Sequence, residues 1–194
     1  MGMNRTRNQR TPHPHSFVRA GYPRRWAASP SVPIIARMNN TDSIITALDN
    51  TPQIILPLVH EVPDSILKRR PQPNKWSAHE HACHLAGVHP LFFSRLDLML
   101  TNPRPVIKPY LPDVDDEDGS LLEVNLDEAM ERFVRDRRRL VERLRELSDE
   151  AWLLTAEHGE YNHYSVFIMF RHLVMHDMLH AYRIEELLLR KDWP

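Results

Sequence analysis

Cysteine and long apolar runs are both scarce in this chain. Cys83 is the single cysteine among 194 residues, so no internal disulfide can form, and a cytoplasmic protein is the simplest expectation. No run of about 18 apolar residues occurs, so the sequence predicts no helix that spans a membrane. Segments in which apolar and polar residues alternate are also lacking, so it predicts no strands. What remains is a protein built from helices.

Acidic residues are missing from the first 37 positions. This segment carries seven of the 25 Lys and Arg side chains and none of the 26 Asp and Glu side chains, so residues 38–194 have a net charge of -8. An acidic body argues against a nucleic-acid-binding domain. Residues 1–37 mix Pro, Arg and Ser without a repeating pattern, and we expect a disordered basic tail. A targeting segment, or a start codon assigned upstream of the true start at Met38, are the alternatives.

Four segments of the body, residues 38–194, place apolar residues at helical spacing. Pro52 and Pro57 should kink or split the first segment. The second and third each open with a polar cap followed three residues later by Glu, the pattern of a capping box. The segments lie at residues 40–63, from Ser77, from Asn125, and from about 165 to 190, with a long Pro- and Asp-rich loop at 101–120. This pattern predicts an all-α four-helix bundle.

Three histidines, His172, His176 and His180, lie four residues apart in the last predicted helix and therefore share one face. The apolar seam of this helix includes His180 and either His176 or Asp177, while His172 lies at its edge. A buried imidazole without a partner is costly. A divalent metal ion supplies such a partner, because neutral imidazole binds Zn, Ni and Fe well.

A metal site open to substrate takes three protein ligands, so another helix must supply the third. The second predicted helix offers four histidines, of which His84 lies on its apolar stripe, His81 at the edge, and His89 just off it. The predicted ligand set is therefore His84, His176 and His180. Core histidines that bond to each other or to the backbone, without a metal, are the alternative that the spacing leaves open.

The motif around His176 also resembles the zinc-protease helix His-Glu-x-x-His. Asp177 stands where that chemistry needs a Glu as general base, which disfavours a protease. Asp177, with His172 and Arg183, is a candidate for contacts behind the ligands or for a contact to substrate. Cys83 lies about 100° around the helix from its neighbour His84, so it points elsewhere. We interpret it as a packing residue and not as a nucleophile.

Two further features have simple interpretations. The charged run "RDRRRLVERLRE" is typical of a solvated helix face, not of a nucleic-acid patch. Trp76 and Trp152 are expected to be core residues or anchors at helix ends.

Several pieces of the sequence, in order, resemble the DinB/YfiT-like superfamily of the DinB_2 type over roughly residues 41–190. The pieces are "RRPQPNKWSAHEHACHLAGVHPLF", "KPYLPDVDDED", "RELSDEAW" and "FRHLVMHDMLHAYRIEELL". The resemblance implies a four-helix bundle with a three-histidine divalent-metal site, and it places that site on His84, His176 and His180. Gly87 and His89 stand where relatives often have an acidic residue, and Arg183 stands where a smaller polar group is common. The resemblance therefore does not define the substrate pocket.

Characterised relatives include S-transferases and an isomerase that use a low-molecular-weight thiol such as bacillithiol or mycothiol, and dimers are common among them. The resemblance thus implies a metal-dependent enzyme, acting as a homodimer, that transfers such a thiol to a small-molecule electrophile. A metal-dependent hydrolase and a non-catalytic, metal-stabilised, stress-associated binding module are the alternatives. A bundle without metal is a further one, and the sequence does not choose among Zn, Ni and Fe.

Overall fold

The structure, a computed structural model, describes residues 34–109 and 119–193, with side chains from residue 41 onward. The chain divides into two units between Val32 and Pro33, and the fold described below is that of the second. Most of the predicted tail therefore lies outside the described residues, as do positions 110–118 of the predicted loop. Helix α1 (Ile34–Glu61) begins inside the segment assigned to that tail.

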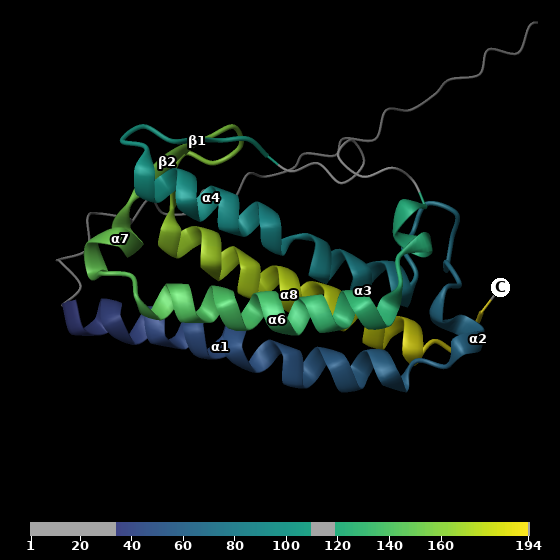
Figure 1. The fold of residues 1–194 in the computed structure, drawn as a ribbon. Coiled ribbons are helices and arrows are strands. Elements are labelled where there is room, and N and C mark those ends of the chain that lie inside the picture. The colour runs from purple at the N-terminus through teal and green to yellow at the C-terminus, as the bar shows by residue number, and fades with distance from the viewer. Residues whose placement is uncertain (1–33, 110–118, 194) are drawn as a thin grey trace, which may run out of the picture. The chain divides into compact units, whose positions relative to one another are not determined.

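Four long helical segments form a bundle (Figure 1): α1, then α3 (Ala78–Gly87) continued by α4 (His89–Thr101), then α6 (Leu126–Arg145), and α8 (Val166–Leu188). Both α1 and α3 pack against α6 and α8, so α1 and α3 occupy opposite corners. Figure 1 shows α1 and α8 running in one direction and the other two segments in the opposite direction. Short helices α2 (Asp64–Leu67), η1 (Ser120–Glu123) and α7 (Asp149–Leu153) lie in the connections. The predicted all-α four-helix bundle is confirmed.

Polar caps begin three of the long helices. Ser77 Oγ accepts a hydrogen bond from the backbone N–H of Glu80, and the Glu80 carboxylate accepts from the Ser77 N–H at 2.8 Å. This reciprocal pair satisfies two backbone donors at the start of α3. The side chain of Asn125 accepts a hydrogen bond at 3.1 Å from the backbone N–H of Glu128, and the side chain of Ser165 accepts one from the N–H three residues later at the start of α8. The predicted helix starts at Ser77 and Asn125 are therefore confirmed.

Pro52 and Pro57, which were expected to kink or split the first helix, both lie inside α1, and the helix is not split at either of them. A proline has no N–H to donate to the carbonyl four residues earlier. Pro52 thereby frees the carbonyl of Leu48, which accepts a hydrogen bond from Arg137 Nη1 at 3.3 Å. Pro57 frees the carbonyl of Gln53. This residue is exposed, so water can donate a hydrogen bond to its carbonyl. Substitute donors thus let the helix continue through both prolines.

The second predicted helix is instead two helices that meet at Val88. Pro90, in the first turn of α4, cannot donate to the carbonyl of Ala86, which explains the interruption. The predicted stripe nevertheless continues across the junction, because all five of its members are buried: His84, Val88, Phe92, Leu96 and Met99.

Three short strands correct the expectation of a strand-free chain. They are β1 (Val106–Ile107), β2 (Thr155–His158) and β3 (Tyr164–Ser165), with β2 in the middle, parallel to β1 and antiparallel to β3. The sheet lies at the end of the bundle near α4 and α7 (Figure 1). Strands of two to four residues are too short to show an alternating pattern in sequence.

Buried apolar side chains form two separate clusters, one toward the sheet and one toward α2. Between them, each long helical segment contributes buried polar side chains. These are Thr51 of α1, His84 and His89 of α3 and α4, Arg137 of α6, and Asp177 and His180 of α8. A polar layer of this kind is costly unless every group finds a partner. The site described below is built in this layer.

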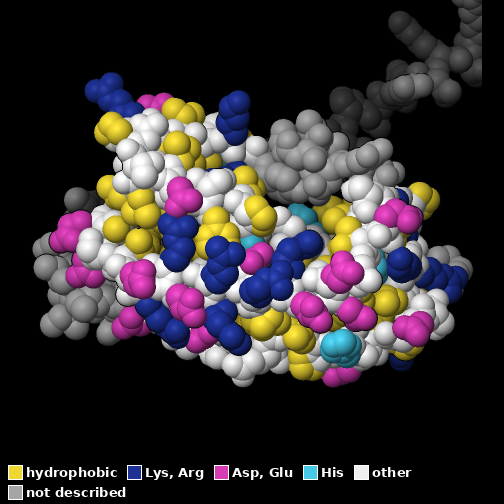
Figure 2. Space-filling model, viewed as in Figure 1, with side chains coloured by type: hydrophobic (Ala, Val, Ile, Leu, Met, Phe, Trp, Pro, Cys, Tyr) yellow, Lys and Arg dark blue, Asp and Glu magenta, His cyan; other side chains and the backbone are white. Residues whose placement is uncertain are grey.

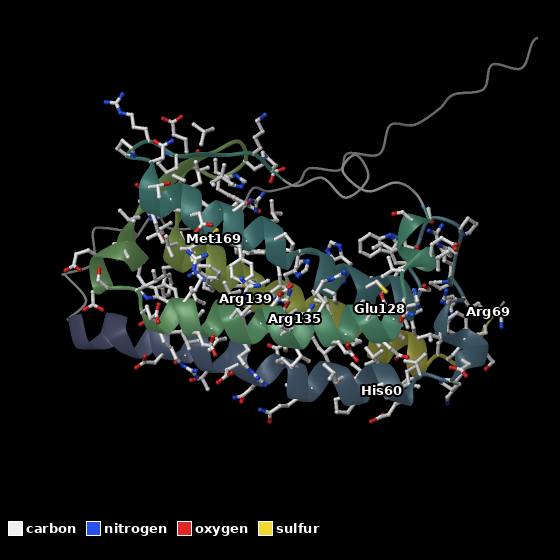
Figure 3. The ribbon with its side chains drawn as sticks, in the orientation of Figure 1. His60, Arg69, Glu128, Arg135, Arg139 and Met169 are labelled. Carbon is white, nitrogen blue, oxygen red and sulfur yellow. The ribbon has the colours of Figure 1, made fainter. Side chains whose placement is uncertain are left out.

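Basic and acidic side chains are interspersed over α1 and α6 on the face shown in Figure 2. Arg135 and Arg139, which are labelled along α6 in Figure 3, are both exposed, as expected for a solvated helix face. Arg137 from the same run is buried, which corrects that prediction at one position. Within residues 34–109 and 119–193, no helix combines the length and apolar character needed to cross a bilayer.

Candidate metal centre

His84 of α3 and His176 and His180 of α8 converge where these two helices pack together. Nε2 of His176 lies 3.0 Å from Nε2 of His84 and 3.1 Å from Nε2 of His180. One potential ligand atom from each residue lies within 4.8 Å of the other two. The structure thus brings together the three histidines that the helical spacing had selected, although they are separated by about 90 positions in sequence.

Hydrogen bonding alone cannot satisfy both short contacts of His176 Nε2. A ring nitrogen carries either one N–H or one lone pair, so it serves one such neighbour well and not two. A metal ion accepts the lone pairs of all three nitrogens. Nitrogens that share a four-coordinate Zn at 2.0–2.1 Å are about 3.3 Å apart, close to the two spacings observed here. The donor set and its geometry therefore fit a divalent ion.

The buried rings of this cluster are neutral at pH 7. Burial, followed by repulsion from the His176 ring, lowers the pKa of His84 to about 3. The same causes, in the same order, lower the pKa of His180 to about 2. Both rings can therefore offer lone pairs without first losing a proton. His176 is at the rim of the cluster, with 27% of its side chain exposed.

Two residues of the α3 region contact the cluster from outside. His81 Nδ1 lies 2.8 Å from Nδ1 of His180. When His180 uses Nε2 as a ligand, its proton is on Nδ1 and is donated to His81, which fixes the orientation of the ligand ring. The indole of Trp76 packs over His84 and His180, with ring centroids 4.9 and 5.9 Å away. Trp76, expected to be a core residue or helix-end anchor, is therefore a wall of the cluster.

Asp177 lies behind His176, inside the bundle. Its Oδ2 accepts a hydrogen bond from Arg137 Nη1 at 2.6 Å, and the two side chains are only 0% and 1% exposed. Its Oδ1 lies 3.7 Å from Nδ1 of His176, close enough to attract the proton that a ligating His176 carries there. Burial favours a raised pKa for Asp177, but His176 and the charge of Arg137 outweigh burial and hold the pKa below its usual range.

A family model described as the DinB superfamily matches residues 47–184. The chain belongs to the DinB superfamily. Among solved structures, YfiT from Bacillus subtilis is similar, with a TM-score of 0.69, 23% sequence identity, and coverage of 76% of this chain and 85% of that one. YfiT is described as a probable metal-dependent hydrolase with an unusual four-helix bundle topology. At this identity the likeness concerns the fold. No curated protein matches the chain.

Arg137 is the residue of this DinB-superfamily bundle that sequence reasoning missed. Besides Asp177 and the Leu48 carbonyl, it reaches His89, to which its Nε donates at 3.1 Å. Because Nε2 of His89 accepts this bond, the ring proton is on Nδ1. Burial, followed by the charge of Arg137, lowers the pKa of His89 to about 4. His89, expected just off the apolar stripe, is therefore a neutral core residue.

His172, Arg183 and Cys83 are not among the three converging histidines. His172 packs against Tyr161, with ring centroids 5.3 Å apart, and is not among the converging histidines of the DinB bundle. Arg183 forms a surface ion pair with Glu186 at 2.7 Å. Cys83 is buried, and burial raises the pKa of its thiol to about 11, as suits a packing residue.

Proposed function

We propose that His84, His176 and His180 hold a divalent metal ion, Zn, Ni or Fe, and that the chain transfers a low-molecular-weight thiol to a small-molecule electrophile. The observation that carries this proposal is the convergence of three imidazoles at metal-ligand spacing beside an open cavity. The membership of the DinB superfamily is consistent with such a site.

A divalent ion bound by three neutral imidazoles lowers the pKa of a thiol or water that joins them. The residues of the chain hold the rings in place for this purpose. Asp177 lies behind His176, His81 accepts the proton of His180, and Trp76 covers one side of the cluster. These contacts restrict rotation of the His176 and His180 rings, and the indole of Trp76 shields one side of the histidine cluster from water.

Two carboxylates near the cluster, Asp177 and Glu80, are already engaged, which favours a thiol over water as the nucleophile. A hydrolase of the zinc-protease kind needs a free carboxylate as its base. Asp177 is bound to Arg137, and Glu80 accepts hydrogen bonds from Arg70 and from the backbone of Ser77. A thiol, whose ordinary pKa is about 8.5 against about 15.7 for water, needs less help to lose its proton.

The thiol has to come from a second substrate. Cys83 cannot supply it, because its side chain is buried and its pKa is raised to about 11. A protonated, enclosed thiol is a poor nucleophile. The reaction that we propose therefore has two substrates, a small thiol and an electrophile. The thiol loses its proton to solvent, its sulfur forms a bond to the electrophilic carbon, and the group displaced from that carbon leaves as an anion, a halide in the case of an aryl halide.

A metal-dependent hydrolase is the second candidate. It is favoured by the likeness to YfiT, which spans 85% of that chain and whose description is a probable metal-dependent hydrolase. Water then takes the place of the thiol beside the same three histidines.

Elemental analysis tests the metal. The full-length chain, expressed in medium that contains Zn, Ni and Fe, is expected to carry about one ion per chain. His172→Ala, a matched control from the same helix, is expected to carry the same amount. His84→Ala and His180→Ala are expected to lose the ion, because two imidazoles rarely suffice for a tight site. Absence of a bound ion in the unmutated chain, even after reconstitution, would exclude the proposed site.

Activity assays then separate the chemistries. Consumption of a chromogenic aryl halide that requires an added thiol, and that disappears in His180→Ala, supports the transferase. Cleavage of model esters or amides without any thiol supports the hydrolase instead. A metal-loaded chain that is inactive in both panels supports a non-catalytic binding module. Equal rates for the unmutated chain and His180→Ala would contradict chemistry at the metal.

A further inference from the structure

A cavity of about 810 Å³ opens beside the histidine cluster, between residues 71–76 and the end of α8. This volume is typical of sites for small molecules. Trp76 and His81 line the cavity and also contact the cluster, since His81 bonds to His180 at 2.8 Å and Trp76 packs over His84 at 4.9 Å. The cavity and the cluster therefore share Trp76 and His81 as a common wall.

Basic side chains predominate in this cavity. Four basic and two acidic residues line it: Lys75, Arg183, Arg190, Lys191, Glu186 and Asp192. Glu186 is already paired with Arg183, and Arg190 donates to the backbone carbonyl of Asp192 at 2.8 Å. Across the described part of the chain, no carboxylate forms an ion pair with Lys75, Arg190 or Lys191. The body as a whole is acidic, so this excess of positive charge is local.

We propose that this cavity binds the anionic end of a small molecule that carries two negative charges as carboxylates or phosphate. The inference rests on the proposed function, because it identifies one substrate of the same site by its charge. The anionic end lies among Lys75, Arg190 and Lys191, and an uncharged part packs on Trp76 toward the histidines. The cavity and the cluster together then select a molecule with an anionic end and a reactive end.

The chemistry of the three cations suits this ligand. The guanidinium of Arg190 can bind carboxylate or phosphate with two parallel hydrogen bonds, and each lysine adds a compact charge with three donors. Arg190 also lies over the ring of Trp193 at 5.5 Å, which holds its guanidinium at the rim before any ligand arrives. A cation that is already positioned loses less entropy on binding.

Calorimetric titration of the metal-loaded, full-length chain tests the proposal with three probes: inorganic phosphate, succinate, and the neutral analogue succinamide. The unmutated chain is expected to bind at least one of the two anions, more weakly as salt is added, and not to bind succinamide. Lys75→Gln/Lys191→Gln is expected to weaken binding about tenfold, the sum of two partly exposed charge contacts. Preference for phosphate or for succinate identifies which anionic group is recognised.

The matched control is Arg104→Gln/Lys108→Gln, which removes the same charge from exposed positions that do not line the cavity. Its affinity is expected to equal that of the unmutated chain. Failure of both anions to bind, equal binding of succinamide, or equal weakening in both double variants would overturn the proposal. The metal site is tested separately, because Lys75→Gln/Lys191→Gln should keep its ion, and His180→Ala should lose its ion and still bind the anion.

Discussion

Replacement of Arg137 by Met tests how the buried polar layer is stabilised. The Arg137–Asp177 pair is 2.6 Å long, and its side chains are 1% and 0% exposed, so Arg137→Met leaves a buried carboxylate without its cation. Breaking such a pair costs about 3–5 kcal/mol. The Leu48 carbonyl and the His89 ring also lose their donor, at about 1 kcal/mol each. We expect a total loss of about 5–7 kcal/mol, a large part of the stability of a typical domain.

Arg145→Met is the matched control on the same helix. Arg145 pairs with Asp49 at 2.7 Å, nearly the same distance, but these side chains are 55% and 48% exposed. Water screens such a pair, so its removal should cost less than about 1 kcal/mol. Because the two distances are nearly equal, the difference between the variants measures the effect of burial.

Urea unfolding of the metal-free chain at pH 7, followed by circular dichroism at 222 nm, gives the free energies. The double variant Arg137→Met/Asp177→Leu should recover most of the lost stability, since no uncompensated charge remains in the core. It also keeps the test informative if Arg137→Met does not fold. A cost below about 1 kcal/mol for Arg137→Met, or a double variant no more stable than the single one, would refute this account of the layer.

Three other predictions follow from the same layer and its surroundings. Asp177→Asn should weaken metal binding about 10- to 100-fold in a chelator competition, because the group behind His176 loses its charge; unchanged affinity would show that Asp177 does not support the ligand. The folded-state pKa of His89 is lowered to about 4, so the stability tied to its neutral ring is present above pH 6.5 and is lost as pH falls toward 4. His89→Gln keeps an acceptor for Arg137 and should therefore gain about 2 kcal/mol relative to the unmutated chain between pH 7 and pH 5 in urea titrations, whereas a constant difference would contradict the assignment. Ser77→Ala should cost about 1 kcal/mol in the same assay by removing the cap of α3, and a neutral result would show that the capping box is not stabilising.

Helical spacing was enough to choose the three converging histidines. Residues four apart on one helix share a face, which linked His176 to His180, and the apolar stripe of the second segment singled out His84. Spacing could not decide whether His176 or Asp177 lies in the seam, because they are adjacent and both near its margin. The structure buries Asp177 completely and leaves His176 partly exposed, a choice set by Arg137 on another helix.

Arg137 was missed although the sequence contains a trace of it. Apolar residues at 130, 133, 140 and 144 mark the buried face of α6 and leave position 137 on that face. Three neighbouring arginines concealed this position, and its partner Asp177 is 40 residues away in the chain. Such a pairing depends on tertiary packing. The contacts of Trp76 and His81 with the cluster likewise depend on how the loop before α3 meets α8.

The buried polar layer has two parts that differ in what they need. One part is centred on Arg137. Its guanidinium donates to an acceptor on each of three other helices: the Leu48 carbonyl that Pro52 frees, the His89 ring, and the Asp177 carboxylate. This part satisfies its main charges within the protein and ties α6 to α1, α4 and α8. The three converging histidines differ, because His176 Nε2 has two close nitrogen neighbours and can serve one of them. The first part of the layer thus pairs its two charges without a ligand, whereas an ion would satisfy the converging nitrogens of the second, and the Arg137–Asp177 pair holds the carboxylate directly behind His176.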